Sequence, residues 1–232
     1  MIAIIDYGAG NIKSVENALK MLGQETMLTK DANQIACADR VVLPGVGSFG
    51  DAMERIRKEG LEEVIQDICH RGTPFLGICL GLQLLFEESE ESPGVKGLSI
   101  LPGKIVRFPK DMPDVLQEKQ SKKKGNVDHE DRKEGYSYLK VPEIGWNELS
   151  YPKNNNPRRL FAGVPEHSYV YFVHSYYLKS SDPSIVAAKS DYGLYFDASV
   201  EKDNIFACQF HPEKSERIGM KMLKNFLEVP TC

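Results

Sequence analysis

The stretch "PFLGICLGLQLLF" (residues 74–86) joins an apolar run to a helical pattern through one cysteine between two glycines. We interpret 74–78 as a buried strand and 80–89 as a helix, because the apolar residues change from a continuous run to helical spacing. The two glycines let the chain turn sharply without a Cβ clash, so Cys79 would project at the carboxyl edge of a sheet. A free cysteine is more often a small buried hydrophobic residue. Other parts of the sequence must therefore show whether Cys79 is a nucleophile or a packing residue.

Strand and helix patterns alternate through the whole first half of the chain. Apolar runs predict strands at 2–5 and 40–45, and apolar residues at helical spacing predict helices at 11–23, 49–60 and 61–72. Continuous apolar strands between helices are typical of a parallel sheet that is covered on both faces.

The second half is richer in β-branched and aromatic residues. It predicts strands at 169–177, 184–190, 194–200 and 204–212, and a closing amphipathic helix at 215–229. The segment at about 110–138 is charged and poor in apolar residues, so we expect a mobile loop insertion there. We interpret residues 1–232 as a single α/β domain.

Composition excludes several classes of protein. The net charge of −4 gives no basic excess for nucleic acid, and no apolar run approaches the roughly 20 residues of a membrane span. The amino-terminal apolar run ends at Asp6, too early for a signal peptide, and the five cysteines have no metal-finger spacing. We therefore expect a cytoplasmic protein with no metal, no cofactor and no nucleic-acid or membrane partner.

A nucleophilic thiol needs a base and a group that orients the base, and "FHPEKS" (210–215) offers both. Pro212 argues against a helix, and in an extended chain His211 and Glu213 would project to the same side. A helix starting after Cys79 would favour the thiolate, with the Leu80 N–H positioned for an oxyanion. An ordinary strand end is the plainer reading of 210–215. His174 alternates with aromatic residues in "YFVHSYY", which would allow it to line the site, but a satisfied core histidine is the more ordinary role and the one we expect.

Several motifs occur together across the chain. They are "IDYGAGNIKSV" (5–15), "LPGVGSFG" (43–50), "LGICLGLQLLFEESEESPGVKGL" (76–98), "IGWNEL" (144–149), "YFVHSYY" (171–177) and "QFHPEKS" (209–215). With them the sequence resembles the class I (triad) glutamine amidotransferases, and more narrowly the glutaminase subunits of imidazole glycerol phosphate synthase. The resemblance spans nearly the whole chain except about 110–138, and implies a flavodoxin-like α/β fold with a mainly parallel central sheet flanked by helices.

The resemblance also implies the chemistry and its residues. Cys79, His211 and Glu213 would form the triad, in which the cysteine attacks the side-chain amide of L-glutamine and water later releases glutamate. The backbone of Leu80, Gly45 and Val46 would form the oxyanion hole. Glutamine would be held by Gly47, Gln83, Glu91, Ser175 and Tyr176. Gln83 lies one helical turn beyond Cys79 and can share its face.

Ammonia released into water would be lost, so the resemblance implies a partner that uses it. In this family the partner is a HisF-type cyclase subunit, a (β/α)8 barrel that forms a heterodimer with the glutaminase. Glu143 stands before "IGWN" where many bacterial members carry His, which leaves open a paralogue that supplies ammonia to another acceptor, such as a sugar amidotransferase. A catalytically silent interaction subunit and a cysteine hydrolase of another amide are the remaining alternatives.

Overall fold

The computed structural model describes residues 1–8, 11–110, 112 and 139–231. Apart from residues 110 and 112, the expected insertion at 110–138 lies outside the described residues. Half of the main sheet is parallel, with the strand order β2-β1-β3-β4-β12. These strands are β1 (Ile2–Ile5), β2 (Thr26–Thr29), β3 (Arg40–Gly45), β4 (Phe75–Cys79) and β12 (Ile205–Cys208). This is the strand order of flavodoxin-like folds, as the resemblance implied.

The sheet continues from β12 through strands β11, β9, β6 and β5, and β10 pairs with β11. These strands are β5 (Glu88–Ser89), β6 (Gly103–Arg107), β9 (Tyr176–Ser180), β10 (Val186–Asp191) and β11 (Tyr195–Lys202). Most neighbours in this half are antiparallel, although β5 and β6 are parallel. A separate antiparallel ribbon consists of β7 (Glu143–Glu148) and β8 (Tyr169–His174).

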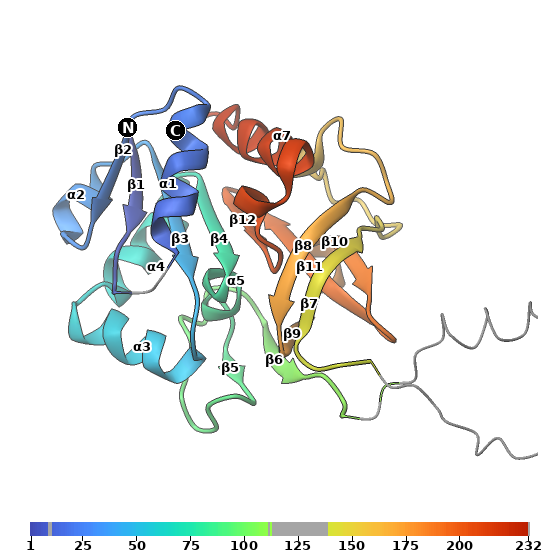
Figure 1. The fold of residues 1–232 in the computed structure, drawn as a ribbon. Coiled ribbons are helices and arrows are strands. Elements are labelled where there is room, and N and C mark those ends of the chain that lie inside the picture. Colours follow the sequence, from blue (N-terminus) through green and yellow to red (C-terminus); the bar gives the residue numbers. More distant parts are fainter. Residues whose placement is uncertain (9–10, 111, 113–138, 232) are drawn as a thin grey trace, which may run out of the picture.

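Helices cover both faces of the parallel half (Figure 1). The α-helices are α1 (Ile12–Met21), α2 (Ala32–Ala36), α3 (Phe49–Lys58), α4 (Glu62–Arg71), α5 (Leu80–Leu84) and α7 (Glu216–Leu227), and the 3-10 helices are η1 (Arg159–Phe161), η2 (Pro183–Ile185) and η3 (Pro212–Lys214). One buried cluster joins the apolar faces of α1 and α7, and a second joins those of α3 and α4. Burial of these two clusters on opposite faces fixes the positions of the strand ends.

The helix predicted at 80–89 is wrong in its length, because α5 ends at Leu84 and a strand begins at Glu88. Main-chain carbonyls beyond this point accept from a distant segment: Leu84 O from Leu98 N at 2.8 Å and Leu85 O from Ile100 N at 2.9 Å. Tertiary hydrogen bonds thus replace the helical ones. The strand predicted at 169–177 is likewise divided into β8 and β9, with a break at Ser175.

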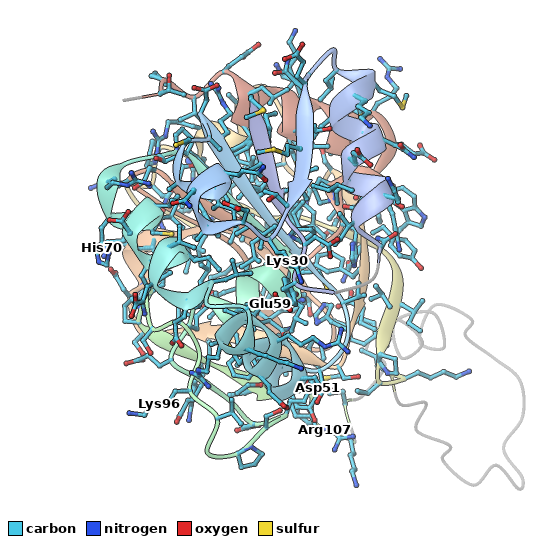
Figure 2. The ribbon with its side chains drawn as sticks, turned by 90° about the vertical axis from the view of Figure 1, so that its left-hand side faces the viewer. Lys30, Asp51, Glu59, His70, Lys96 and Arg107 are labelled. Carbon is cyan, nitrogen blue, oxygen red and sulfur yellow. The ribbon has the colours of Figure 1, made fainter. Side chains whose placement is uncertain are left out.

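An exposed ion pair joins the residue that follows α3 to the segment after β2. Lys30 Nζ lies 3.0 Å from Glu59 Oε2, and Figure 2 shows both side chains on the outer side of the molecule. Exposed pairs of this kind contribute little to stability, so the apolar face of α3 holds the helix in place. No described helix combines the length and the apolar character needed to cross a bilayer.

Candidate active site

Cys79 is the last residue of β4 and has a backbone conformation (φ 55°, ψ −107°) that is unusual for a non-glycine residue. Both neighbouring glycines are required by close packing of the turn. A Cβ on Gly81 would lie 1.8 Å from the Leu43 carbonyl oxygen, and one on Gly77 would lie 2.8 Å from the Gly81 carbonyl oxygen. Strained backbone of this kind persists only where the surroundings hold it, and here it marks a nucleophile-elbow turn.

The parallel pairing of β12 with β4 brings His211 close to Cys79. Cys208 lies opposite Ile78 in the register, so both chains leave the sheet at the same edge (Figure 1). His211 Nδ1 lies 2.8 Å from Glu213 Oε1, and both side chains are buried. The extended conformation predicted here is wrong: Pro212 begins the 3-10 helix η3, and its missing N–H is no cost at that position.

Asn11 is a further residue at this site, and no role was assigned to it from its sequence context. Its Nδ2 donates to Glu213 Oε1 at 3.1 Å, and its Oδ1 accepts from Ser14 Oγ at 2.7 Å. Asn11 therefore orients the carboxylate that contacts the histidine. Its place in the motif "YGAGN" was a signal, but only the fold brings it to Glu213.

His211 is positioned to carry a positive charge. Burial of the ring opposes that charge and would lower the pKa of His211, but the Cys79 thiolate and the Glu213 carboxylate outweigh it and raise the pKa to about 10. His211 Nε2 makes no aligned hydrogen bond to any described residue. Such contacts commonly tighten only when substrate binds.

We expect the substitution Cys79→Ser to lower the pKa of His211 by about one unit or more, because it removes the negative thiolate and leaves burial opposed by Glu213 alone. NMR titration of the histidine ring measures this. Cys208→Ser is the matched control, since Cys208 is buried nearby and does not contribute to the pKa of His211. An unchanged pKa in Cys79→Ser would show that the thiolate does not act on the ring.

A cavity of about 310 Å³ opens beside Cys79. Nine of the eleven residues proposed from the sequence line it: Val46, Gly47, Cys79, Leu80, Gln83, Glu91, Ser175, Tyr176 and His211. Glu213 is buried behind His211, and Gly45 lies in β3 opposite Cys79. A cavity of this size is suitable for a small metabolite.

Two of the expected glutamine-binding side chains already have protein partners. Gln83 Nε2 donates to the Tyr176 carbonyl at 3.2 Å and to Gln209 Oε1 at 3.1 Å. Glu91 Oε2 accepts from the Phe49 N–H at 2.7 Å, at the start of α3. Both residues therefore also hold the walls of the cavity in place.

Gln209 is a second residue that we did not assign from the sequence. Its side chain is fully buried, and its Nε2 donates to Cys79 Sγ at 3.8 Å. A donor at the sulfur favours the thiolate form. The motif "QFHPEKS" includes Gln209, but His211 and Glu213 are the residues of this motif to which we assigned roles.

Of the expected oxyanion residues, Gly45 ends β3, Val46 lies in the loop after it and Leu80 begins α5. Val46 and Gly47 line the cavity, and Gly47 has φ +105°, a region that favours glycine. Gly45 is a glycine for another reason: a Cβ there would lie 2.4 Å from Tyr7 Oη. Conformational freedom in this loop is therefore concentrated at Gly47.

The other cysteines have different surroundings. Cys69 and Cys208 are buried, and burial raises the pKa of both thiols, that of Cys69 to about 12. Cys37 is exposed, and Cys232 lies outside the described residues. Within the described ranges, no group of three or more His, Cys, Asp or Glu side chains is placed to hold a metal ion.

Comparisons with known proteins agree with this geometry. The family model "Glutamine amidotransferase class-I" matches residues 3–229. The chain is 46% identical to "Imidazole glycerol phosphate synthase subunit HisH" of Syntrophotalea carbinolica, over 97% of this chain and 98% of that protein. It is 44% identical to the protein of the same name from Methanothermobacter thermautotrophicus, over 99% and 98%.

A solved structure described as "Crystal structure of glutamine amidotransferase" has a similar fold, with a TM-score of 0.67. It is 17% identical, and the match covers 98% of this chain and 97% of the other. At that identity the likeness concerns the fold alone. From the family match over residues 3–229, the chain belongs to the class-I glutamine amidotransferase family.

Proposed function

We propose that the chain is the glutaminase subunit of an imidazole glycerol phosphate synthase. It hydrolyses L-glutamine to glutamate and ammonia, and a HisF-type cyclase subunit consumes the ammonia in histidine biosynthesis. The observation that carries the proposal is the near-complete match, at 42–46% identity, to several proteins named for that subunit. The elbow at Cys79 and the His211–Glu213 contact support the chemistry.

The proposed reaction begins at the sulfur of Cys79. The thiolate attacks the amide carbon of the glutamine side chain, and the oxyanion that forms accepts from the Leu80 N–H and from the loop at Val46–Gly47. Protonated His211 then gives its proton to the leaving nitrogen, and ammonia departs. The raised pKa of His211 supports its role as this acid.

The second half of the proposed reaction restores the enzyme. The remaining γ-glutamyl thioester is attacked by water, with neutral His211 taking the proton from the water molecule. Glutamate leaves, and the sulfur again becomes a thiolate paired with protonated His211. Glu213 and Asn11 hold the ring in one orientation throughout, which the 2.8 Å and 3.1 Å contacts support.

A surface beside the cavity suits a protein partner. Ile144 and Trp146 on β7 and Tyr169 on β8 are exposed, and Val46 at the cavity mouth is exposed as well. Ile144 and Trp146 are two residues apart in a strand and so share one face of the ribbon, away from buried Glu143. We assign this face, continuous with the cavity through Val173, to the cyclase subunit.

Reconstitution with the cyclase of the same organism tests this function. With glutamine and the phosphoribosyl-formimino nucleotide, we expect imidazole glycerol phosphate and glutamate to form in equal amounts. The cyclase supplied with an ammonium salt instead is the control, because it needs no glutaminase. Glutamate without the imidazole product, when the control succeeds, would indicate another acceptor. No glutamate at all would indicate a silent subunit.

A further inference from the structure

A second buried carboxylate–histidine pair lies in the wall of the cavity. Glu143 begins β7 and His174 ends β8, and the two face each other across the ribbon. His174 Nε2 lies 3.1 Å from Glu143 Oε2, and each side chain is 3% exposed. His174 is buried, as expected of a core histidine, but its Nε2 has no aligned hydrogen bond and the residue also lines the cavity.

The other ring nitrogen of His174 fixes its proton. His174 Nδ1 lies 2.9 Å from the Tyr176 carbonyl oxygen, and since a carbonyl can only accept, Nδ1 carries a hydrogen. A bare lone pair on Nε2 would face the carboxylate oxygen and be repelled. A further proton therefore belongs between Nε2 and Oε2, although these atoms are not aligned as a hydrogen bond in this structure.

Both members of the pair are held from outside. Asn147 Nδ2 donates to Glu143 Oε1 at 2.9 Å and to the Asp191 carbonyl at 2.8 Å, which ties the carboxylate to β10. The His174 ring packs against Phe108, Phe172 and Phe196, with ring centroids 5.3 to 5.5 Å apart. The imidazole is therefore enclosed by aromatic rings and cannot easily turn.

From His174 a run of polar contacts leads to the reactive sulfur. The Tyr176 carbonyl accepts from His174 and also from Gln83 Nε2 at 3.2 Å. Gln83 in turn donates to Gln209, whose Nε2 points to Cys79 Sγ at 3.8 Å. Ser175 and Tyr176 lie at the junction of β8 and β9. The Glu143–His174 pair, at the outer end of this run of contacts, thus fixes their backbone.

We propose that Glu143 and His174 are positioning residues for glutamine. They hold the Ser175–Tyr176 backbone and the Gln83 amide in the arrangement that binds the substrate, and they touch no reacting atom. This inference rests on the proposed glutaminase function. A buried carboxyl–imidazole pair costs desolvation that an apolar pair would avoid, so its presence beside a substrate cavity is best explained by the hydrogen bond from His174 to the Tyr176 carbonyl that it fixes.

The substitution Glu143→Gln keeps the shape and removes the charge. We expect the KM for glutamine to rise about tenfold, while kcat stays within about twofold, because binding geometry is lost and the triad is untouched. Glu201→Gln is the matched control. Glu201 is an equally buried carboxylate that accepts from Arg159 Nε at 2.7 Å and does not line the cavity. The KM of the Glu201→Gln protein for glutamine should therefore stay unchanged.

Alkylation of Cys79 separates positioning from a general structural effect. In Glu143→Gln we expect a glutamine-shaped alkylating analogue to react about tenfold more slowly, with the rate for iodoacetamide unchanged, both followed by mass spectrometry of the Cys79 peptide. Equal slowing of both reagents, or a fall in kcat at constant KM, would overturn the proposal. If Glu143→Gln does not fold, Glu143→Asp, which retracts the charge, should give a smaller rise in KM, and an unchanged KM there would also overturn it.

Failure of the proposed function has a different signature. In that case the unmodified chain with its cyclase would release no glutamate, and the glutamine-shaped analogue would react with Cys79 no faster than expected from iodoacetamide. Normal behaviour of the unmodified chain together with an unaltered Glu143→Gln would reject the positioning role alone.

Discussion

The substitution Cys79→Ala should reduce glutamate release by a factor of about 10⁴ or more, because without the thiolate no covalent intermediate can form. The fold should persist. Cys79 is 7% exposed, and alanine removes only the sulfur from a turn whose close contacts belong to the glycines at 77 and 81. Steady-state assay of glutamate, with circular dichroism to check folding, measures both quantities.

Labelling of the thiols distinguishes this role from mere packing. A glutamine-shaped alkylating analogue should modify Cys79 in preference to the other four cysteines. Burial raises the pKa of Cys69 and Cys208, so neither is a ready nucleophile, and exposed Cys37 does not line the cavity beside Cys79. Cys37→Ser is the matched control, and it should keep full activity and full labelling at Cys79.

Two results would reject the assignment of Cys79. One is full activity in a folded Cys79→Ala protein. The other is equal labelling of Cys79 and Cys37 by the glutamine-shaped reagent, because selective labelling needs a binding site next to the thiol.

The elbow could be predicted from the sequence because its constraints are local. Gly77 is needed because of its contact with Gly81, and Gly81 because of its contact with Leu43 in the adjacent strand β3. An apolar run before a helical pattern shows where the turn falls. The parallel direction of β1, β3 and β4 follows from the same apolar runs, since strands buried on both faces need helical connections.

Features that depend on distant partners could not be predicted in this way. The α5 helix stops at Leu84 because residues near 98 supply hydrogen bonds to the following carbonyls. Edge strand β2 is only half-buried along most of its length, so its pattern is weak. The roles of Asn11, Gln209 and Glu143 arise from side-chain contacts across more than 30 residues, which no local spacing reveals.

The 3-10 turn at Pro212 shows how a wrong local conformation can still give the right pair. An extended chain would place His211 and Glu213 on one side. The structure achieves the same meeting with a tight turn, in which Lys214 N donates to the His211 carbonyl at 3.0 Å. Short separation in sequence, rather than strand geometry, was the reliable part of the prediction.

We expect the chain alone to be nearly inactive and its partner to activate it. An oxyanion hole needs a second N–H besides that of Leu80, and the Val46–Gly47 peptide borders the cavity where such a donor is required. Gly47, at φ +105°, lets this peptide change orientation at low cost, whereas Gly45 is confined in β3 beneath Tyr7. Loss of one such donor typically slows catalysis by about 10² to 10³.

The partner would act by favouring the orientation in which the N–H points inward. Val46 is exposed at the cavity mouth, so a bound cyclase can contact this loop directly. The free energy by which the partner shifts this equilibrium equals the difference between its binding free energies for the two orientations. Binding of the nucleotide substrate to the cyclase can add to this difference. Glutamine is then hydrolysed only when an acceptor for ammonia is present.

Three measurements of glutamate release test this activation: the chain alone, the chain with cyclase, and the complex with the nucleotide substrate or an analogue. We expect the rate to rise by about 10² to 10³ in total, the size of one oxyanion donor. Gly47→Ala should reduce the activated rate more than the basal rate, because alanine disfavours φ +105°. Iodoacetamide should label Cys79 equally in all three states, since the proposed switch changes an oxyanion donor and leaves the thiol as it is. A rate that stays constant across the three states, with complex formation verified by gel filtration, would exclude the switch and would count against the cyclase as the partner.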